Sequence, residues 1–86
     1  MSFCLADGVL TQKLGPQLVL LHVPQGQYFE LNSTGAVVLE AILAGSDEVA
    51  AAEQLSRRFE VDLVRARTDV SALVKDLTAR ALLILK

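Results

Sequence analysis

Hydrophobic and polar residues alternate through the first third of the chain, whereas apolar residues recur at helical spacing through the rest. Segments 9–13, 17–23 and 27–31 are rich in aliphatic residues and are separated by Leu14-Gly15-Pro16 and Pro24-Gln25-Gly26. Proline presets φ for a turn and glycine can take positive φ, so both breaks are typical of short loops between strands. The pattern predicts a three-stranded antiparallel β-meander.

The third of these strands, residues 27–31, lies at an edge of the predicted sheet. Its alternation puts Phe29 and Leu31 on one face and Tyr28 and Glu30 on the other. An open edge beside an apolar helix is a place to bind an extended peptide, because its unpaired backbone groups can accept another strand. The same edge permits a homodimer that forms by sheet extension.

Three helices are predicted after the strands, because the hydrophobic period changes to 3–4 residues. Their predicted N-caps are side chains that can accept a backbone N–H: Asn32 or Ser33, then Ser46 or Asp47, then Asp62. Gly45 is expected to end the first helix, and the third is the longest, about residues 62–80. The side chains expected to face inward are Val38, Leu39, Ile42 and Leu43, then Val49, Ala52, Leu55 and Phe59, then Leu63, Ala66, Val70, Leu73 and Leu77.

Strands followed by three helices are typical of an α+β domain of winged helix-turn-helix type. With only 86 residues, we expect one domain, residues 1–86. The last six residues are apolar except for Lys86, and either a continued helix or a short strand fits them. A structural subunit that docks through residues 82–85 is one functional hypothesis for this segment.

Composition excludes several classes of function. The net charge of −2 gives no long-range attraction to nucleic acid or to an anionic membrane. The single cysteine, Cys4, cannot form an internal disulfide, which indicates a reducing compartment. The first eight residues lack the features of a signal peptide, and no apolar run approaches the roughly 18 residues that span a bilayer. We expect a cytoplasmic protein without a membrane partner.

The sequence offers little catalytic or metal-binding chemistry. One histidine, His22, and Cys4 cannot supply the about four ligands of a closed zinc site. The five glycines are scattered singly, so there is no phosphate-binding loop. Acidic residues recur every seven positions on the third helix, but oppositely charged residues four positions away neutralise such stripes: Arg65–Asp69, Asp76–Arg80 and, on the second helix, Glu53–Arg57. We expect no enzyme activity, metal or cofactor.

The third helix separates two hypotheses. A DNA-binding regulator needs a basic recognition helix, and this helix carries four basic against three acidic residues: Arg65, Arg67, Lys75 and Arg80 against Asp62, Asp69 and Asp76. A peptide-binding protein needs a mixed groove, and a stripe on the helix offers one: Val64, Arg67, Ser71, Val74 and Thr78. Val70, Val74 and Tyr28 would form pockets, while Arg67 and Lys75 would pair with an acidic peptide. The alternative for Val70 and Val74 is packing onto the sheet.

The chain resembles the PqqD-like family over residues 9–85. The motifs that carry the resemblance are Gln27-Tyr28-Phe29-Glu30-Leu31-Asn32-Ser33-Thr34-Gly35-Ala36, Leu39, Ala44-Gly45, Phe59-Glu60-Val61-Asp62, the Asp69-Val70…Leu73…Leu77 helix and Leu82-Leu83. The resemblance implies a recognition element for the leader peptide of a ribosomally synthesised, post-translationally modified peptide. Stand-alone members of this size resemble the small partner protein of lasso-peptide pathways, which presents the precursor to a leader protease and a cyclase.

The resemblance also implies which residues bind the leader. In the family the leader adds a strand beside the third strand, with the third helix as the other wall. The strand positions match the motif directly, and the helix positions match by spacing: Tyr28, Phe29, Glu30 and Leu31, and Arg67, Val70, Ser71, Val74 and Lys75. A glycine commonly precedes the final Leu-Leu in such domains, whereas Ala81 stands here. Because alanine tolerates left-handed backbone poorly, Ala81 keeps a helix that continues past Arg80 as one of the two alternatives for the last six residues.

Overall fold

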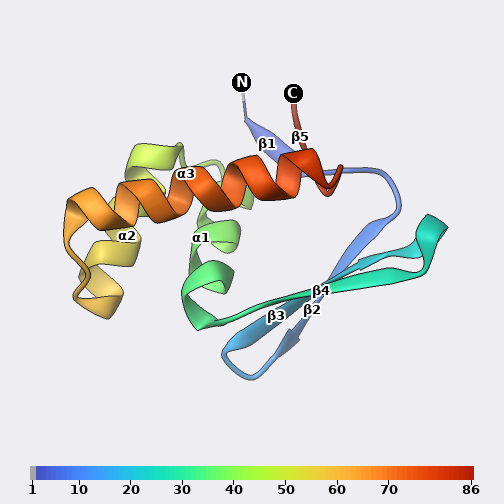
Figure 1. Ribbon diagram of the computed structural model, residues 1–86, viewed down its shortest axis with the longest axis horizontal. Coiled ribbons are helices and arrows are strands. Elements are labelled where there is room, and N and C mark those ends of the chain that lie inside the picture. Colours follow the sequence, from blue (N-terminus) through green and yellow to red (C-terminus); the bar gives the residue numbers. More distant parts are fainter. Residues whose placement is uncertain (1) are drawn as a thin grey trace.

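The computed structural model describes residues 2–86; Met1, which the expected domain 1–86 includes, lies outside the described residues. Figure 1 shows the elements in chain order. They are β1 (Phe3–Leu5), β2 (Val9–Leu14), β3 (Gln17–His22), the 3-10 helix η1 (Val23–Gln25), β4 (Gln27–Leu31), α1 (Ser33–Leu43), α2 (Glu48–Phe59), α3 (Leu63–Ala79) and β5 (Leu83–Leu85). This order confirms the predicted α+β class.

Strands β2, β3 and β4 form the predicted antiparallel meander, with β3 in the middle. In its register Leu20 pairs with Thr11 on β2 and with Phe29 on β4. The predicted turn before β4 contains η1, and Gly26 ends it at φ +64° while its N–H donates to the Val23 carbonyl at 3.1 Å. That positive φ is why glycine suits this position.

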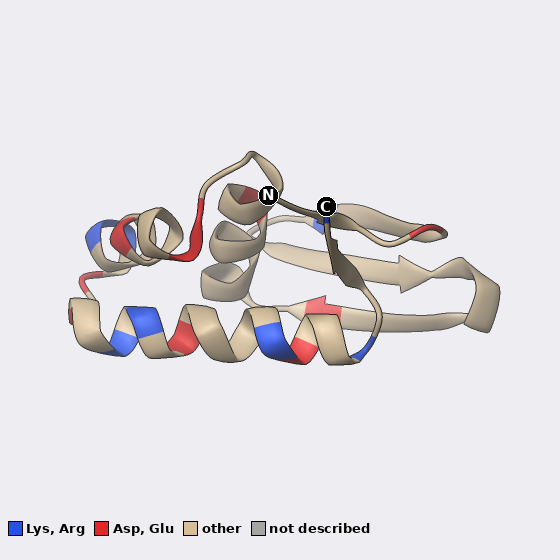
Figure 2. Ribbon diagram, turned by 90° about the horizontal axis from the view of Figure 1, so that it is seen from above, with Lys and Arg blue, Asp and Glu red and all other residues tan. Residues whose placement is uncertain are grey.

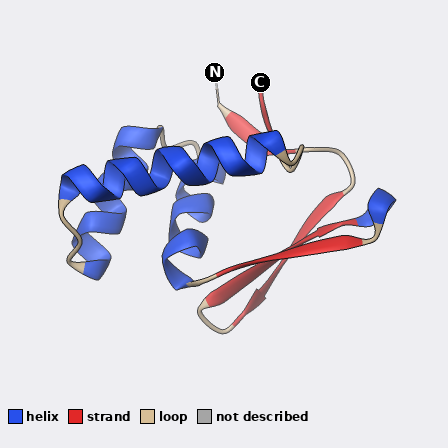
Figure 3. Cartoon of the chain, viewed as in Figure 1, coloured by secondary structure: helices blue, strands red, loops and turns tan. Residues whose placement is uncertain are grey.

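The helices lie on one side of this sheet (Figure 3). Two caps settle the alternatives for their starts, because the Asn32 side chain accepts the Gly35 N–H at 3.0 Å and Asp47 accepts the Ala50 N–H at 2.8 Å. Asp62 is the N-cap residue of α3, but its side chain makes no capping hydrogen bond. The Asn32 cap fixes where β4 turns into α1 and therefore places α1 beside the sheet.

Two apolar clusters hold these layers together. One lies between the sheet, α1 and the end of α3, and consists of Val9, Leu18, Leu20, Ala36, Leu39, Leu77, Leu82 and Leu83. The other joins the three helices, and consists of Val38, Ala41, Ile42, Ala51, Ala52, Leu55, Ala66, Val70 and Val74. Leu73 packs against both clusters, so it links the helical layer to the sheet layer.

Two residues expected in the core are exposed. Val49 was predicted to face inward, but the buried side of α2 is formed by Ala51, Ala52 and Leu55, and Val49 lies off that stripe. Leu63 lies on the buried side of α3, but it is the first residue of the helix and precedes the first buried position, Ala66. Both predictions were wrong.

The C-terminal strand β5 pairs antiparallel with β1. The sequence pattern did not predict β1. Phe3 pairs with Leu85, and Ser2 and Lys86 exchange two backbone hydrogen bonds of 2.8 Å. Figure 1 shows the two ends of the chain side by side. The fold therefore contains a second, two-stranded sheet.

The transition from α3 to β5 occurs at Ala81, which has φ +60°. Of the two alternatives for the last six residues, the continued helix is therefore wrong and the short strand forms. Left-handed alanine costs roughly 1–2 kcal/mol, but the turn places Leu82 and Leu83 in the core, where each contributes about 1.5–3 kcal/mol. Leu82 and Leu83 are buried and therefore not available for docking, whereas Ile84 and Leu85 are exposed. The hypothesis of a subunit that docks through 82–85 is left with these two residues.

Candidate functional site

The free edge of β4 is the first component of the site. Within the described residues β4 pairs only with β3, so at every second residue its backbone N–H and C=O point away from the sheet. Phe29 and Leu31 are half-buried toward the helices, whereas Tyr28 and Glu30 are exposed. These orientations agree with the alternation predicted from the sequence.

A groove separates this edge from α3. One hollow of about 300 Å³ lies at the Leu31 end of β4 and is lined by Glu30, Leu31, Asn32, Thr34, Gly35, Val38, Leu55, Asp69 and Leu73. A second hollow of about 400 Å³ lies at the other end and is lined by Gly26, Gln27, Tyr28, Phe29 and Arg80. We call the two hollows together the β4–α3 groove. One hollow lies at each end of β4 and the two share no lining residue, so an extended peptide beside the strand would reach both.

Local sequence explains the shape of the first hollow. Leu31, Val38, Leu55 and Leu73 provide an apolar floor. Gly35 lies in the first turn of α1, where a Cβ would come within 3.3 Å of the Leu31 Cβ. The absence of a side chain at Gly35 therefore lets the start of α1 approach the end of β4 closely.

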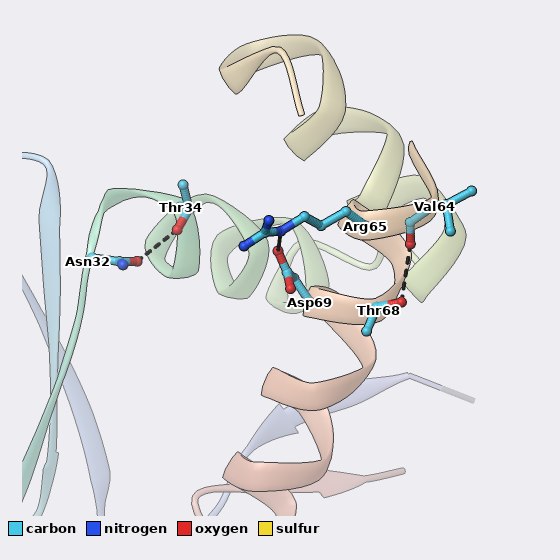
Figure 4. A network of polar contacts seen from close by, with 6 residues as sticks. All are labelled: Asn32, Thr34, Val64, Arg65, Thr68 and Asp69. Carbon is cyan, nitrogen blue, oxygen red and sulfur yellow. Dashed lines mark hydrogen bonds and ion pairs between the residues drawn. The ribbon is translucent and has the colours of Figure 1, made fainter. Parts of the chain in front are cut away.

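The rim of the groove is polar but largely neutralised. Figure 4 shows Arg65 and Asp69 on α3 on the side that faces Asn32 and Thr34. Arg65 Nε lies 3.8 Å from Asp69 Oδ2, and the Thr34 hydroxyl donates to Asn32 Oδ1 at 2.8 Å. At the other end, Arg80 Nε pairs with Asp76 Oδ1 at 3.0 Å. Both predicted pairs on α3 are confirmed; the predicted Glu53–Arg57 pair does not form within 4 Å among the described residues.

The structure places the residues of the predicted helix wall away from the two hollows beside β4. Arg67, Ser71 and Lys75 line a different hollow of about 570 Å³ on the side of α3 near the start of α2, together with Glu48, Val49, Thr68 and Ala72. Val70 and Val74 are only 0% and 6% exposed, and they belong to the core between the helices and not to the cluster at the sheet, onto which the alternative placed them. The stripe that faces β4 instead contains Asp69, Leu73 and Arg80.

The remaining candidates for chemistry lie outside the groove. His22 is partly buried, as expected of a structural residue, and its Nδ1 has no hydrogen-bond partner. Cys4 is a free thiol on β1. In residues 2–86 no group of three or more His, Cys, Asp or Glu side chains is placed to hold a metal ion.

The charge distribution gives α3 no basic face. Figure 2 shows Lys and Arg interspersed with Asp and Glu along the whole helix. No helix of the described chain combines the length and the apolar character that crossing a membrane requires. The mixed charges along α3 do not favour the DNA-binding alternative, which depends on concentrated positive charge.

Comparisons with known proteins agree with this architecture. Residues 17–83 match the family model described as coenzyme PQQ synthesis protein D (PqqD). The solved structure "Lasso peptide synthetase B1 complexed with the leader peptide" is similar at TM-score 0.91 and 27% identity, covering 99% of this chain and 100% of that one. "TbiB1 in Complex with the TbiA(beta) Leader Peptide" matches in fold at TM-score 0.84 and 23% identity, covering 96% and 94%. Curated proteins yield no match.

Proposed function

This chain belongs to the PqqD family, and we propose that it is a recognition element that binds the leader peptide of a ribosomally synthesised, post-translationally modified peptide. The observation that carries the proposal is the free edge of β4, which faces α3 across a groove with an apolar floor. The likeness to a protein whose structure was solved with a leader peptide, over the whole of both chains, supports it.

Binding would proceed by strand addition. The leader would pair with the outward backbone groups of β4 and extend the sheet to a fourth strand. Because side chains alternate along a strand, every second leader residue would face the groove, where Leu31 and Leu73 form the floor. Tyr28, Phe29, Glu30 and Leu31 keep the roles expected from the sequence, and Asp69, Leu73 and Arg80 replace the helix residues.

The protein would act without catalysis. Holding the precursor next to its enzymes raises the effective concentration of the substrate, so binding alone accelerates processing. We propose a pathway of the lasso type, with a leader protease and a cyclase as the enzymes that receive the precursor, because the protein of the 27% identical structure is named a lasso peptide synthetase B1.

Fluorescence anisotropy tests the proposal with a labelled leader peptide from the precursor encoded beside this protein. We expect saturable binding that is lost when the leader's apolar residues are replaced by serine. Duplex DNA of the same label serves as the control ligand and is expected to show no salt-dependent binding. The proposal is overturned if neither the leader nor the intact precursor binds.

A further inference from the structure

The hollow of about 570 Å³ between the start of α2 and α3 lies on the flank of α3 that turns away from β4. Successive residues of an α-helix are about 100° apart, so Ser71, which lines this hollow, lies on roughly the opposite side of α3 from Leu73, which lines the groove. Figure 4 shows Val64, on the same flank as Ser71, pointing away from Asn32 at the end of β4. We call this site the α2–α3 hollow; it shares no lining residue with the β4–α3 groove.

The α2–α3 hollow carries a surplus of positive charge. The two basic residues of α3 that lie outside it are each paired with an aspartate four positions away. Neither Arg67 nor Lys75, which line it, forms an ion pair within 4 Å in residues 2–86. Glu48 is the one acidic residue of the lining, and it is the first residue of α2, where the positive end of the helix dipole partly offsets its charge. An acidic partner would therefore complement this site, although the chain as a whole has a net charge of −2.

The shape of the hollow suits a helix. Ser71 and Ala72 lie between Arg67 and Lys75, and small side chains at the contact let a neighbouring helix approach closely. Arg67 and Lys75 are eight residues apart, about 12 Å along the helix axis, which carboxylates about two turns apart on the neighbouring helix would match. Val49 is 50% exposed in the same lining and offers an apolar contact. The complementary ligand is thus an acidic helix with an apolar residue on the same face.

The position of the hollow narrows which enzyme carries this helix. An enzyme that cuts the leader must reach the peptide beside the β4–α3 groove. An enzyme that acts on the core peptide, the part of the precursor that follows the leader, can dock on a flank of α3 that the leader does not touch. Because the groove and the hollow lie on opposite flanks, such an enzyme and the leader would bind at the same time without competing.

We infer that the α2–α3 hollow is the docking site for an acidic helix of the cyclase of the proposed pathway. Arg67 and Lys75 pair with carboxylates of that helix, and Val49 contacts its apolar residue. The inference rests on the proposed function, because the pathway supplies the enzyme. The protein thereby holds the precursor on one side of α3 and the cyclase on the other, which raises the effective concentration of the core peptide at this enzyme.

The test uses the full chain, the leader peptide and the cyclase encoded beside this protein, and calorimetry measures cyclase binding with and without saturating leader. Arg67→Glu/Lys75→Glu is expected to weaken cyclase binding about tenfold or more, because each reversal removes an attraction and adds a repulsion. Arg57→Glu/Arg58→Glu is the matched control, since it changes the net charge equally in the last turn of α2. At physiological salt exposed charges are screened beyond about 8 Å, so the control should keep its affinity for the cyclase within about twofold.

Both double variants are expected to bind the leader as the unmodified protein does, which separates this inference from the proposed function. Arg67→Gln/Lys75→Gln keeps good helix formers, and it substitutes for the charge-reversed variant if that protein unfolds. The inference is overturned if the cyclase does not bind, if the charge-reversed variant binds it as the unmodified protein does, or if the control loses as much affinity. Displacement of the cyclase by the leader also overturns it, as does binding of duplex DNA that the charge-reversed variant abolishes, because the hollow would then bind phosphates.

Discussion

The guanidinium carbon of Arg80 lies 4.9 Å from the centroid of the Phe29 ring, so the end of α3 touches the open strand β4. Arg80 Nε also donates to Asp76 Oδ1 at 3.0 Å, which holds the planar group over the ring. At this contact the strand β4 and the end of α3, which form the two sides of the β4–α3 groove, lie next to each other. A cation over an aromatic face is attracted by the quadrupole of the neutral ring, which is negative at the face.

Arg80→Ala is expected to weaken leader binding about two- to fivefold, because an exposed cation–π contact contributes about 0.5–1 kcal/mol. Without the guanidinium, Phe29 loses the contact that orients it at the end of the groove. Anisotropy with the labelled leader measures the change. Arg57→Ala on α2 removes the same charge away from the groove, and an equal loss in that variant would show a general charge effect instead.

Val74→Glu is expected to lower the free energy of unfolding by about 3 kcal/mol or more, because it places a carboxylate in the helical core without a partner. Val74 is 6% exposed, whereas Val64 on the same helix is 72% exposed. Val64→Glu should therefore change stability by less than about 0.5 kcal/mol. Urea unfolding measures both variants, and a fully stable Val74→Glu protein would mean that α3 is rotated from the position described here.

Leu73→Ala is expected to weaken leader binding about tenfold, since Leu73 belongs to the apolar floor and truncation of a central contact residue has this effect. Lys75→Ala should leave the affinity within about twofold, because Lys75 lies in the hollow near α2. Anisotropy compares the two, with a thermal melt to confirm that each is folded. A larger loss of affinity for Lys75→Ala than for Leu73→Ala would indicate that the leader binds the stripe of α3 predicted from the sequence.

N-methylation along the leader backbone should show a period of two. Each methyl group removes one N–H donor, and in an added antiparallel strand only alternate residues donate to the neighbouring strand. We expect loss of binding at every second position within the paired segment and little change between them. A uniform response to N-methylation would indicate a peptide that binds without strand addition.

Ala81→Gly is expected to raise the free energy of unfolding by about 1 kcal/mol, because glycine takes left-handed backbone without the steric cost that alanine has at φ +60°. Ala79→Gly, inside the last turn of α3, should lower it by about 0.5–1 kcal/mol. Chemical denaturation should show that the two variants change the free energy of unfolding in opposite directions if the turn at Ala81 has this geometry. A destabilised Ala81→Gly protein would contradict it.

The parts of the fold that the sequence predicts have local causes. Pro24 and Gly26 mark the turn before β4, and the Asn32 side chain caps α1 through a residue three positions away. The strand β1 had no such signal, because three residues that pair with the opposite end of the chain carry no turn or period of their own. The turn at Ala81 also had no local signal, because the burial of Leu82 and Leu83 outweighs the preference of alanine for right-handed backbone.

The sequence predicts the orientation of the site residues on β4 but not the side of α3 that faces them. On β4, alternation assigns Phe29 and Tyr28 to opposite faces without any knowledge of the neighbours. On α3, periodicity identifies the buried stripe but does not tell which flank faces β4 and which faces α2. Lys75 and Leu73 therefore exchange roles once both neighbours are placed.

The pairing of β1 with β5 also determines how the domain responds to force. Because Phe3 is opposite Leu85, both ends of the chain leave the ladder at the same side. Tension applied between the ends would open this ladder one hydrogen bond at a time, as a zipper opens, instead of shearing all the bonds at once. An unfolding enzyme that pulls on the two ends would therefore open the β1–β5 ladder first. Leu83 would then leave the core at an early stage.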